Sequence, residues 1–350
     1  MLKLTENNSQ PKPFIIPVFL PHLGCPHQCA FCNQNAITGV NNNTLSLKNI
    51  SFLIDEFVKY KKDGRGQAEI AFYGGNFLGL PTDQIKSLLH LSAKYVDKNI
   101  VQGIRFSTRP DTIDKKRLDI INGFPVSTIE IGVQSMDDLV LANVGRGHTA
   151  EDSEKAFYLL KARNYKTGAQ IMVGLPGESK SSTQYTGSKI ADIRPDFVRI
   201  YPAVVLAGSL LEKWYKQGTC KPLSLEKCVK RVKKLYLLFV RKNIRVIRMG
   251  LQASENFEKK NHILAGPYHP AFGHMVLSEI FFDNAVNKIR LKGKINNAVS
   301  IAVNPRNISK MRGLNNINVT KLMHMFDIKT LNIIPDQRIK ADDCSIIFSV

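Results

Sequence analysis

Three cysteines lie within eight residues of the chain, at Cys25, Cys29 and Cys32. They follow the apolar run 15–20, which places three thiolates on one short loop at the end of a strand. Structural zinc takes four protein ligands, and ordinary iron-sulfur electron carriers use four cysteines. The other cysteines lie far along the chain without a CxxC partner: Cys220, Cys228 and Cys344. The spacing therefore predicts a metal centre with one open coordination position.

Two other interpretations of this cysteine loop stay open. His22 or His27 could complete a tetrahedral zinc site with the three thiolates. The cysteines could also be buried thiols without a metal, since a free cysteine packs as a small hydrophobic side chain. The clustered spacing favours a metal centre, because cytosolic thiols stay reduced and more often bind metal than pair.

Short apolar strands and amphipathic helices alternate along the first 200 residues. The expected strands span residues 15–20, 68–73, 104–107, 128–133, 168–173 and 197–201. Strands that alternate with helices form parallel βα units, and ligands bind at the carboxyl ends of such strands. We therefore expect an α/β fold, a partial (β/α)6 barrel like a TIM barrel, with the cysteine loop at its mouth.

The chain divides into three expected parts. Residues 1–13 form a flexible N-terminus, residues 14–255 the partial barrel with a basic C-terminal extension, and residues 260–350 a small α/β domain. In the last part the turn 313–316 separates two short helices that lie between two strands. This order resembles a KH RNA-binding module whose GxxG loop lacks its second glycine. A small cap on the barrel is the alternative.

The net charge of +20 is concentrated in the second half of the chain. Residues 201–260 contain 14 basic and 4 acidic residues, and residues 261–350 contain 11 and 6, so these stretches hold 15 of the 20 net charges. In the expected helix 224–242, basic side chains cover much of the surface outside one apolar face. A basic surface predicts a polyanionic partner, because neutralised phosphates release counterions. A lysine-rich solvated surface is the alternative.

The composition is that of a globular protein, with 43% hydrophobic and 22% charged residues. No stretch approaches the roughly 18 apolar residues of a membrane span. Residues 1–12 are polar and lack the apolar centre of a signal peptide. We expect a cytoplasmic protein without a membrane partner.

The CxxxCxxC spacing, with Phe31 before the last cysteine, resembles the signature of the radical S-adenosylmethionine (SAM) enzymes. The resemblance implies that Cys25, Cys29 and Cys32 hold a [4Fe-4S] cluster and that the remaining iron chelates SAM. One electron, delivered by a reductant such as flavodoxin or ferredoxin, then splits SAM into methionine and a 5'-deoxyadenosyl radical. The cofactor carries the chemistry, and the protein positions it.

Residues at two other strand ends resemble SAM-binding elements of that family. Gly74 and Gly75 resemble the GGE motif, in which glycine backbone contacts the methionine amino group, and Asn76 replaces the usual acid. Glu130 is placed like the carboxylate that holds the ribose hydroxyls. A structural ion pair is the alternative for this glutamate.

Further SAM contacts are implied by the same resemblance. The stretch that contains Val173 resembles the one that passes the adenine, and Phe31 would lie against the same ring. Three polar residues near strand ends complete the expected SAM site: Ser107, Arg109 and Gln134. The resemblance assigns no catalytic residue of the protein itself.

Longer phrases resemble the radical SAM core of the catalytic subunit of the Elongator complex, over roughly residues 14–250. They are Ser107-Thr108-Arg109-Pro110-Asp111, Arg146-Gly147-His148-Thr149, Gly174-Leu175-Pro176-Gly177 and Arg199-Ile200-Tyr201-Pro202. Those relatives modify wobble uridine in transfer RNA (tRNA) with acetyl-CoA, which their acetyltransferase domain binds. About 100 residues follow the core here, without a Q/RxxGxG/A loop, so we expect no acetyltransferase domain.

Three functions follow as hypotheses. The first is a radical SAM enzyme that modifies a tRNA base or another RNA. The second keeps the radical chemistry but acts on a small molecule, as the porphyrinogen oxidases do, whose signature also begins with CxxxCxxC. The third is a non-catalytic RNA-binding protein with a relic cluster site.

Overall fold

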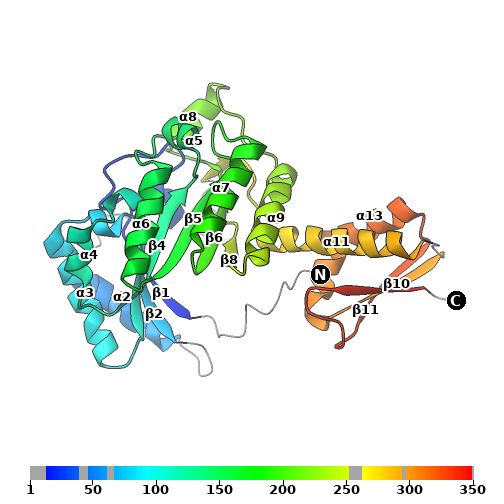
Figure 1. Ribbon diagram of the computed structural model, residues 1–350, viewed down its shortest axis with the longest axis horizontal. Coiled ribbons are helices and arrows are strands. Elements are labelled where there is room, and N and C mark those ends of the chain that lie inside the picture. The colour runs from blue at the N-terminus through cyan, green and yellow to red at the C-terminus, as the bar shows by residue number, and fades with distance from the viewer. Residues whose placement is uncertain (1–12, 39–45, 61–66, 252–261, 294–296, 349–350) are drawn as a thin grey trace.

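The computed structural model describes residues 13–38, 46–60, 67–251, 262–293 and 297–348. Seven strands form one curved sheet in the order β1-β2-β3-β4-β5-β6-β8 (Figure 1). All neighbouring pairs are parallel, so the carboxyl ends of the seven strands lie at one edge, the barrel mouth. The bounds are β1 Phe14–Phe19, β2 Ala68–Tyr73, β3 Gly103–Thr108, β4 Val126–Gln134, β5 Lys166–Val173, β6 Phe197–Pro202 and β8 Arg245–Met249.

The expected partial barrel is confirmed, with one strand more than expected. All six expected strands are present, and β8 extends the sheet beyond β6. The sheet does not close, because β1 and β8 are its two ends. The barrel therefore has an open side between its first and last strands.

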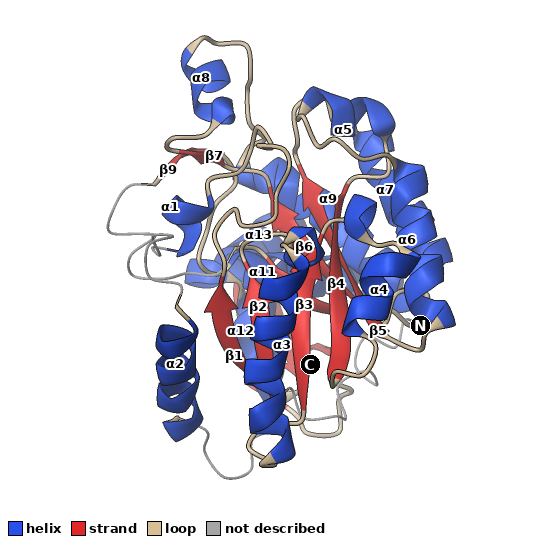
Figure 2. Ribbon diagram, turned by 90° about the vertical axis from the view of Figure 1, so that its left-hand side faces the viewer, coloured by secondary structure: helices blue, strands red, loops and turns tan. Residues whose placement is uncertain are grey.

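Helices cover the outer face of the curved sheet (Figure 2). One hydrophobic core lies between the two layers, and Ile70 and Phe72 of β2 belong to it. The alternate residues Glu69 and Tyr73 turn to the barrel interior, where they contact polar side chains. The helix bounds are α1 Gln34–Thr38, α2 Leu47–Lys59, α3 Thr82–Asp97, α4 Lys115–Ile121, α5 Asp138–Asn143, α6 Ala150–Ala162, α7 Lys180–Ile193, α8 Leu210–Lys216 and α9 Leu225–Arg241.

Capping side chains fix where several of these helices begin. Ser46 caps α2 by accepting a hydrogen bond from the Asn49 N–H, and Ser224 caps α9 in the same way. The expected basic helix 224–242 is therefore confirmed. Its buried side chains include Val229, Val232, Leu235 and Phe239, while the lysine side chains at 227, 230 and 234 are exposed.

A long helix, α11 (Phe272–Lys292), connects the barrel to a second hydrophobic cluster (Figure 1). Phe272 and Val276 pack in the barrel core, whereas Phe281 and Ile289 pack in the second cluster. The second cluster also covers a three-stranded sheet of order β11-β10-β12. The remaining bounds are β7 Val205–Leu206, β9 Ile263–Ala265, β10 Ala298–Val303, α12 Ile308–Arg312, α13 Ile317–Phe326, β11 Thr330–Pro335 and β12 Cys344–Phe348.

The expected strand-helix-turn-helix-strand order of the C-terminal part is present as β10, α12, α13 and β11. β10 pairs parallel with β11 and antiparallel with β12. In the turn, Gly313, Asn315 and Asn316 have positive φ angles, as glycine and asparagine readily adopt. Residues 1–12 and the expected boundary at residue 260 lie outside the described residues, so the division into domains stays a prediction.

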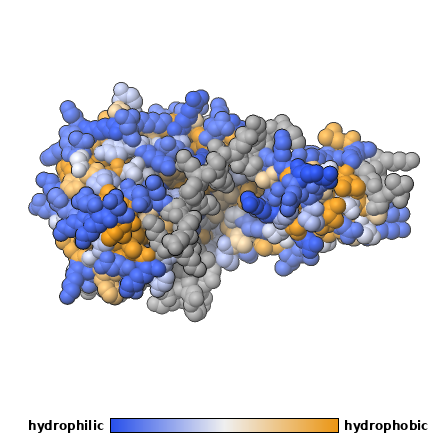
Figure 3. All heavy atoms as spheres, turned by 90° about the horizontal axis from the view of Figure 1, so that it is seen from below, coloured by the Kyte–Doolittle hydropathy of each residue, from blue (hydrophilic) through white to orange (hydrophobic). Residues whose placement is uncertain are grey.

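The described surface is mixed in character. On the face that Figure 3 shows, hydrophilic residues are interspersed with apolar ones over both the barrel and the C-terminal part. Within the described ranges, no helix combines the length and the apolar character that crossing a membrane requires.

Candidate metal and cofactor site at the barrel mouth

Backbone hydrogen bonds to the end of β2 and to the loop after α5 hold the cysteine loop at the barrel mouth. At its start, the Leu20 N–H donates to the Tyr73 carbonyl at the end of β2, at 2.7 Å. In its middle, the Ala30 N–H donates to the Val144 carbonyl, at 2.9 Å. The loop after α5 therefore supports the cysteines from the other side, and we call residues 144–149 the cradle loop.

Glycines allow the cysteine loop to approach the end of β2 closely. A Cβ on Gly24, whose φ is +74°, would lie 2.2 Å from the Asn76 carbonyl oxygen. A Cβ on Gly75 would lie 2.5 Å from the carbonyl oxygens of Leu20 and Leu23. Any side chain at either position would push the two segments apart. The predicted contact of Gly74 and Gly75 with the methionine of SAM stays a prediction.

The three thiols of the loop are free. Cys29 is buried, and Cys25 and Cys32 are half-buried. Burial raises the pKa of Cys32 to about 12, and the neighbouring Cys29 thiolate acts in the same direction. Burial also raises the pKa of Cys25, which the positive charge of Arg146 opposes. These two thiols are therefore neutral at pH 7 until a metal takes the place of their protons.

Two side chains direct N–H groups at the sulfurs. Arg146 Nη1 lies 3.3 Å from Cys29 Sγ, and Gln34 Nε2 lies 3.6 Å from Cys32 Sγ. Such hydrogen bonds favour the thiolate form, which is the form that ligates iron or zinc. The three cysteines and the N–H groups directed at two of their sulfurs therefore fit a metal-thiolate centre.

The arrangement fits a cluster better than a single zinc ion. No group of three or more His, Cys, Asp or Glu side chains in the described part of the chain is gathered as ligands of one ion would be. Each thiolate of an iron-sulfur cluster ligates a separate iron. His22 Nε2 accepts a hydrogen bond from the Gln34 N–H at 2.9 Å, and the His27 ring fills the space beside Gly147. The Nε2 atom of His22 is thus already engaged by the backbone of the loop.

Asn76 is fully buried and joins the cysteine loop to the end of β3. Its Nδ2 donates to the Gly24 carbonyl at 2.8 Å. Its Oδ1 accepts hydrogen bonds from the Thr108 hydroxyl, the Arg109 N–H and the Thr112 hydroxyl, at 2.7 to 2.9 Å. The side chain that was expected to contact SAM thus bonds to protein through both its amide nitrogen and its amide oxygen, and its contact with SAM stays a prediction.

Ser107, Arg109 and Gln134 all lie at or near the carboxyl ends of β3 and β4. Ser107 is half-buried, and Gln134 ends β4 with a φ of +68°, a conformation that is uncommon outside glycine. Arg109 is 2% exposed and pairs with Asp111 at 2.8 Å. Their proximity to the cysteine loop agrees with the expected mouth, while their binding of SAM stays a prediction.

Glu130 lies at the centre of a polar network inside the barrel. Its Oε1 accepts hydrogen bonds from Tyr73 at 2.9 Å and Arg105 at 3.1 Å. Arg199 and Gln170 donate to Oε2 at 2.7 and 2.9 Å. Burial opposes ionisation, but Arg199 and Arg105 outweigh it and hold the pKa of Glu130 below its usual value. The structure thus gives Glu130 the partners of a structural ion pair, and the ribose contact stays a prediction.

Phe31 and Val173 lie on different sides of the sheet edge. Phe31 is half-buried and packs beside Met172, Leu175 and Trp214 near the mouth. Val173 is fully buried in the core between sheet and helices. Only the backbone of Val173 is therefore available to a ligand at the mouth, whereas the Phe31 ring is partly accessible.

Two residues of the cradle loop were not among the predicted site residues. Arg146 and His148 are buried beside the cysteines, and the glycines at 145 and 147 are the sequence signal that could have identified the loop. His148 Nε2 lies 3.2 Å from the Val133 carbonyl oxygen. Burial, followed by the positive charge of Arg146, lowers the pKa of His148 to about 3, so its ring is neutral.

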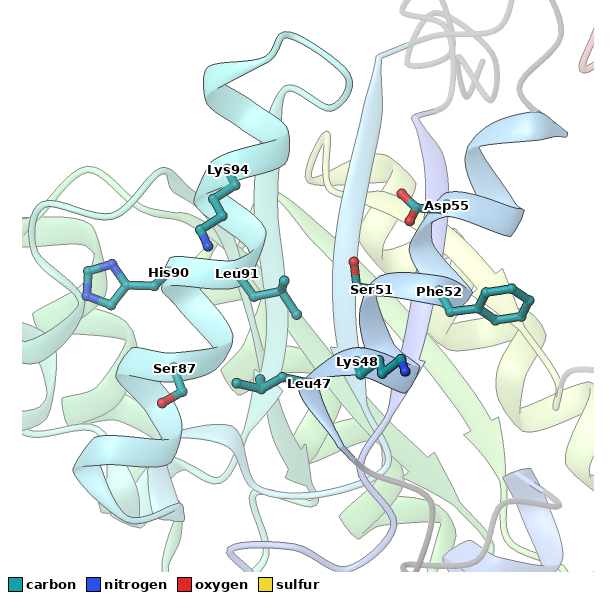
Figure 4. A pocket seen from close by; sticks show the side chains of 9 residues that line it. All are labelled: Leu47, Lys48, Ser51, Phe52, Asp55, Ser87, His90, Leu91 and Lys94. Carbon is teal, nitrogen blue, oxygen red and sulfur yellow. The ribbon is translucent and has the colours of Figure 1, made fainter.

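A surface depression of about 670 Å³ lies elsewhere, on the outer wall between α2 and α3 (Figure 4). Leu47, Phe52 and Leu91 contribute apolar surface, and Lys48 and Lys94 lie at its margins. None of the predicted site residues lines it. The candidate site is thus defined by the mouth and not by this depression.

Family models agree with this geometry. Residues 19–186 match the model of the radical SAM superfamily, and residues 195–282 match the model of the radical SAM C-terminal domain. The chain belongs to the radical SAM superfamily, which confirms the family that the cysteine spacing suggested.

Particular relatives place the chain near the Elongator proteins. It is 32% identical to an uncharacterized protein of Methanocaldococcus jannaschii, over 61% of this chain and 67% of that one. It is 34% identical to the tRNA uridine(34) acetyltransferase of the same organism, over 35% of this chain and 23% of the relative. Human Elongator complex protein 3 is 29% identical over 49% of this chain and 35% of its own length. The chain thus spans only part of the named relatives.

A solved structure shows the same fold. The archaeal Methanocaldococcus infernus Elp3 with an N-terminal deletion superposes with a TM-score of 0.59 at 21% identity. The superposition covers 78% of this chain and 63% of that one. The expected resemblance to the radical SAM core of the Elongator catalytic subunit is therefore confirmed for the fold.

Proposed function

We propose that this radical SAM protein modifies a base of tRNA, with a [4Fe-4S] cluster held by Cys25, Cys29 and Cys32. The observation that supports this proposal most directly is the placement of these three free cysteines at the mouth of a radical SAM barrel. N–H groups are directed at two of the sulfurs. When bound, such a cluster supplies the electron for reductive cleavage of SAM. We propose that SAM binds beside this loop, through the residues expected above at the strand ends.

A tRNA substrate is supported by the relatives. Two proteins that are similar to part of this chain are named tRNA uridine(34) acetyltransferase and Elongator complex protein 3. Their similarity to this chain is confined to a part of their length, so the transferred group does not follow from it. We therefore propose the tRNA base as target and leave acetyl transfer out of the proposal.

The charges of α9 support a phosphate-rich partner. Arg231 and Lys233 form ion pairs inside the protein, with Glu178 and Asp283 respectively. Lys234 is exposed and lies close to Lys180 of α7, whose like charge lowers its pKa. Because helices that follow strands begin at the mouth side of a barrel, the N-terminal lysines of α7 and α9 lie toward the mouth. A polyanion that reaches the site would pass them.

The open side of the barrel gives a large substrate access to the interior. A depression of about 590 Å³ lies at the end of edge strand β8, and Arg248 and His274 contribute polar groups to it. Edge strand β1, at the other end of the sheet, leads directly into the cysteine loop. We propose that the nucleotide enters the mouth from this side.

The C-terminal part is proposed as a separate small domain, residues 260–350, beside the barrel of residues 14–255. Its own hydrophobic cluster, which includes Phe281, Val299 and Leu322, supports this division. Its order of elements supports a KH-like RNA contact at the turn 313–316, where Lys310 and Arg312 lie nearby.

A cytoplasmic location and a flavodoxin or ferredoxin as reductant complete the proposal.

Nucleoside analysis of tRNA tests the proposed substrate. Digested tRNA from a strain that lacks the gene is compared by mass spectrometry with tRNA from its parent. We expect one modified nucleoside to disappear and to return with the intact gene but not with the variant Cys29→Ala. Unchanged tRNA nucleosides, together with 5'-deoxyadenosine formation by the purified protein on a small molecule, would contradict the tRNA proposal.

A further inference from the structure

Arg146 holds its guanidinium in a buried position beside the cysteine loop. Arg146 is only 7% exposed. The backbone on either side has positive φ angles, +62° at Gly145 and +73° at Gly147. A Cβ on Gly147 would lie 2.4 Å from the His27 ring, so the cradle loop reaches this position only with glycine there.

The contacts of the guanidinium aim it at a sulfur. Nη1 donates to Cys29 Sγ at 3.3 Å, and Nη2 donates to the Gly132 carbonyl. A Cβ on Gly132 would lie 2.8 Å from Nη2, so this glycine makes room for the guanidinium. Nε is buried and has no hydrogen-bond partner among the described residues.

The positive charge of Arg146 lacks a carboxylate partner. Among the described residues no Asp or Glu oxygen lies within ion-pair distance of it, although the neighbouring Arg109 pairs with Asp111. A buried charge without a partner destabilises a fold by several kcal/mol. The Arg146 guanidinium cannot lose its proton in a protein. The groups able to balance it are the cysteine sulfurs, once they carry negative charge.

We propose that Arg146 is a positioning residue that balances the charge of the thiolate-bound cluster and raises its reduction potential. The inference rests on the proposed cluster at Cys25, Cys29 and Cys32. On reduction, one electron passes from an external one-electron donor of the ferredoxin or flavodoxin class to the cluster. Arg146 takes up no proton and forms no bond. The added negative charge lies beside its guanidinium, which stabilises the reduced state more than the oxidised state.

A redox titration of the reconstituted full chain tests this role without SAM or RNA. The reduced cluster is followed by electron paramagnetic resonance (EPR) at a series of fixed potentials, under exclusion of oxygen. Arg146→Gln keeps an N–H donor but removes the charge, and Arg146→Lys keeps the charge. We expect the equilibrium constant for reduction of the Gln variant to be about tenfold smaller. Its midpoint potential should then be about 59 mV more negative for a one-electron step. The Lys variant should stay close to the wild-type midpoint.

A control variant separates this effect from the loss of an arginine charge elsewhere in the protein. Arg163 pairs with Asp119 on the outer helical layer, where the end of α6 meets α4. Arg163→Gln should leave the midpoint unchanged. An Arg146→Gln cluster with the wild-type midpoint would overturn the proposal, and if SAM then perturbed its EPR signal less, the guanidinium would serve SAM instead.

Loading failures are informative as well. If Arg146→Gln takes up no iron, Arg146→Lys decides: normal loading with the wild-type midpoint supports the charge balance, and failure to load overturns it. A wild-type chain that takes up no iron and sulfide would refute the proposed function itself, whatever the Arg146 variants do.

Discussion

The Asn76 side chain, which follows β2, ties the cysteine loop to the end of β3. It donates one hydrogen bond to the Gly24 carbonyl and accepts three from Thr108, at the end of β3, and from Arg109 and Thr112, which follow it. The GGE-like spacing identified the position correctly as part of the mouth. It could not show that the amide bonds to protein, because the partners Thr108 and Thr112 come together only in the folded chain.

Asn76→Ala should lower both stability and iron loading. The change leaves buried donors and an acceptor without partners, which costs about 3 kcal/mol. Differential scanning calorimetry and iron analysis after anaerobic reconstitution measure the two effects. Asn318 is a similarly buried asparagine in the C-terminal part, where Nδ2 donates to the Ser278 carbonyl. Asn318→Ala should lower stability but not the iron content. Equal iron loss in both variants would argue against the role of Asn76.

Glu178 connects stability to pH. Burial raises the pKa of its carboxyl to about 7, although hydrogen bonding to the Gly174 N–H and the charge of Arg231 act in the opposite direction. The folded state therefore holds this proton more tightly than the unfolded state, whose pKa lies near 4.5. By linkage, the contribution of Glu178 to stability falls as pH rises from 4.5 to 7.

Glu178→Gln removes this titration. The melting temperature of the variant relative to the wild type should therefore be higher at pH 8 than at pH 5. Thermal unfolding at both pH values measures the difference. A constant difference, or one that changes in the opposite direction, would show that the folded carboxyl has no raised pKa.

The basic helix α9 was predictable from sequence, because its apolar residues repeat at helical spacing and Ser224 marks its start. The sequence did not show which of its basic side chains are already paired. Arg231 and Lys233 contact acids on the β5–α7 loop and on α11 respectively, and these contacts exist only in the folded protein. The lysines at 227, 230 and 234 face solvent, and Lys230 also pairs with Glu226.

Replacing Lys227 and Lys234 together with glutamine should weaken tRNA binding by reducing the number of released counterions. The slope of log K against log salt should become shallower by about 1 for each phosphate that the variant no longer neutralises. Fluorescence anisotropy with labelled tRNA at several salt concentrations measures this slope. Lys98 and Lys166 lie at the opposite end of the barrel, after α3 and at the start of β5. Their double glutamine variant should keep the wild-type slope. Equal slopes for all three proteins would exclude α9 from the RNA contact.

Strand β8 and helix α11 were among the elements that sequence reasoning missed. All five residues of β8 are half-buried, so its sequence lacks the alternation of apolar and polar residues that marks a strand. α11 buries Phe272 and Val276 against the barrel but Phe281 and Ile289 against the small sheet. Its apolar residues therefore do not form a single stripe, and the helical period is hidden.

At the scale of the whole molecule, the first six strands of the barrel could be predicted because each βα unit is local in sequence. The mouth could be predicted because parallel strands bring their carboxyl ends to one edge. The role of Arg146 beside the cysteine loop could not be predicted, since its contact with Cys29 joins residues 117 positions apart. The cradle loop thus depends on the complete fold, although its glycines at 145 and 147 gave a signal.

The metal content of the protein tests the central claim that three thiolates at the barrel mouth hold an iron-sulfur cluster open to SAM. The chain is purified and reconstituted without oxygen, and iron, sulfide and zinc are counted per chain. The account predicts about four irons and four sulfides, with an EPR signal of the reduced cluster that changes when SAM is added. One tightly bound zinc, with no uptake of iron and sulfide, would contradict it.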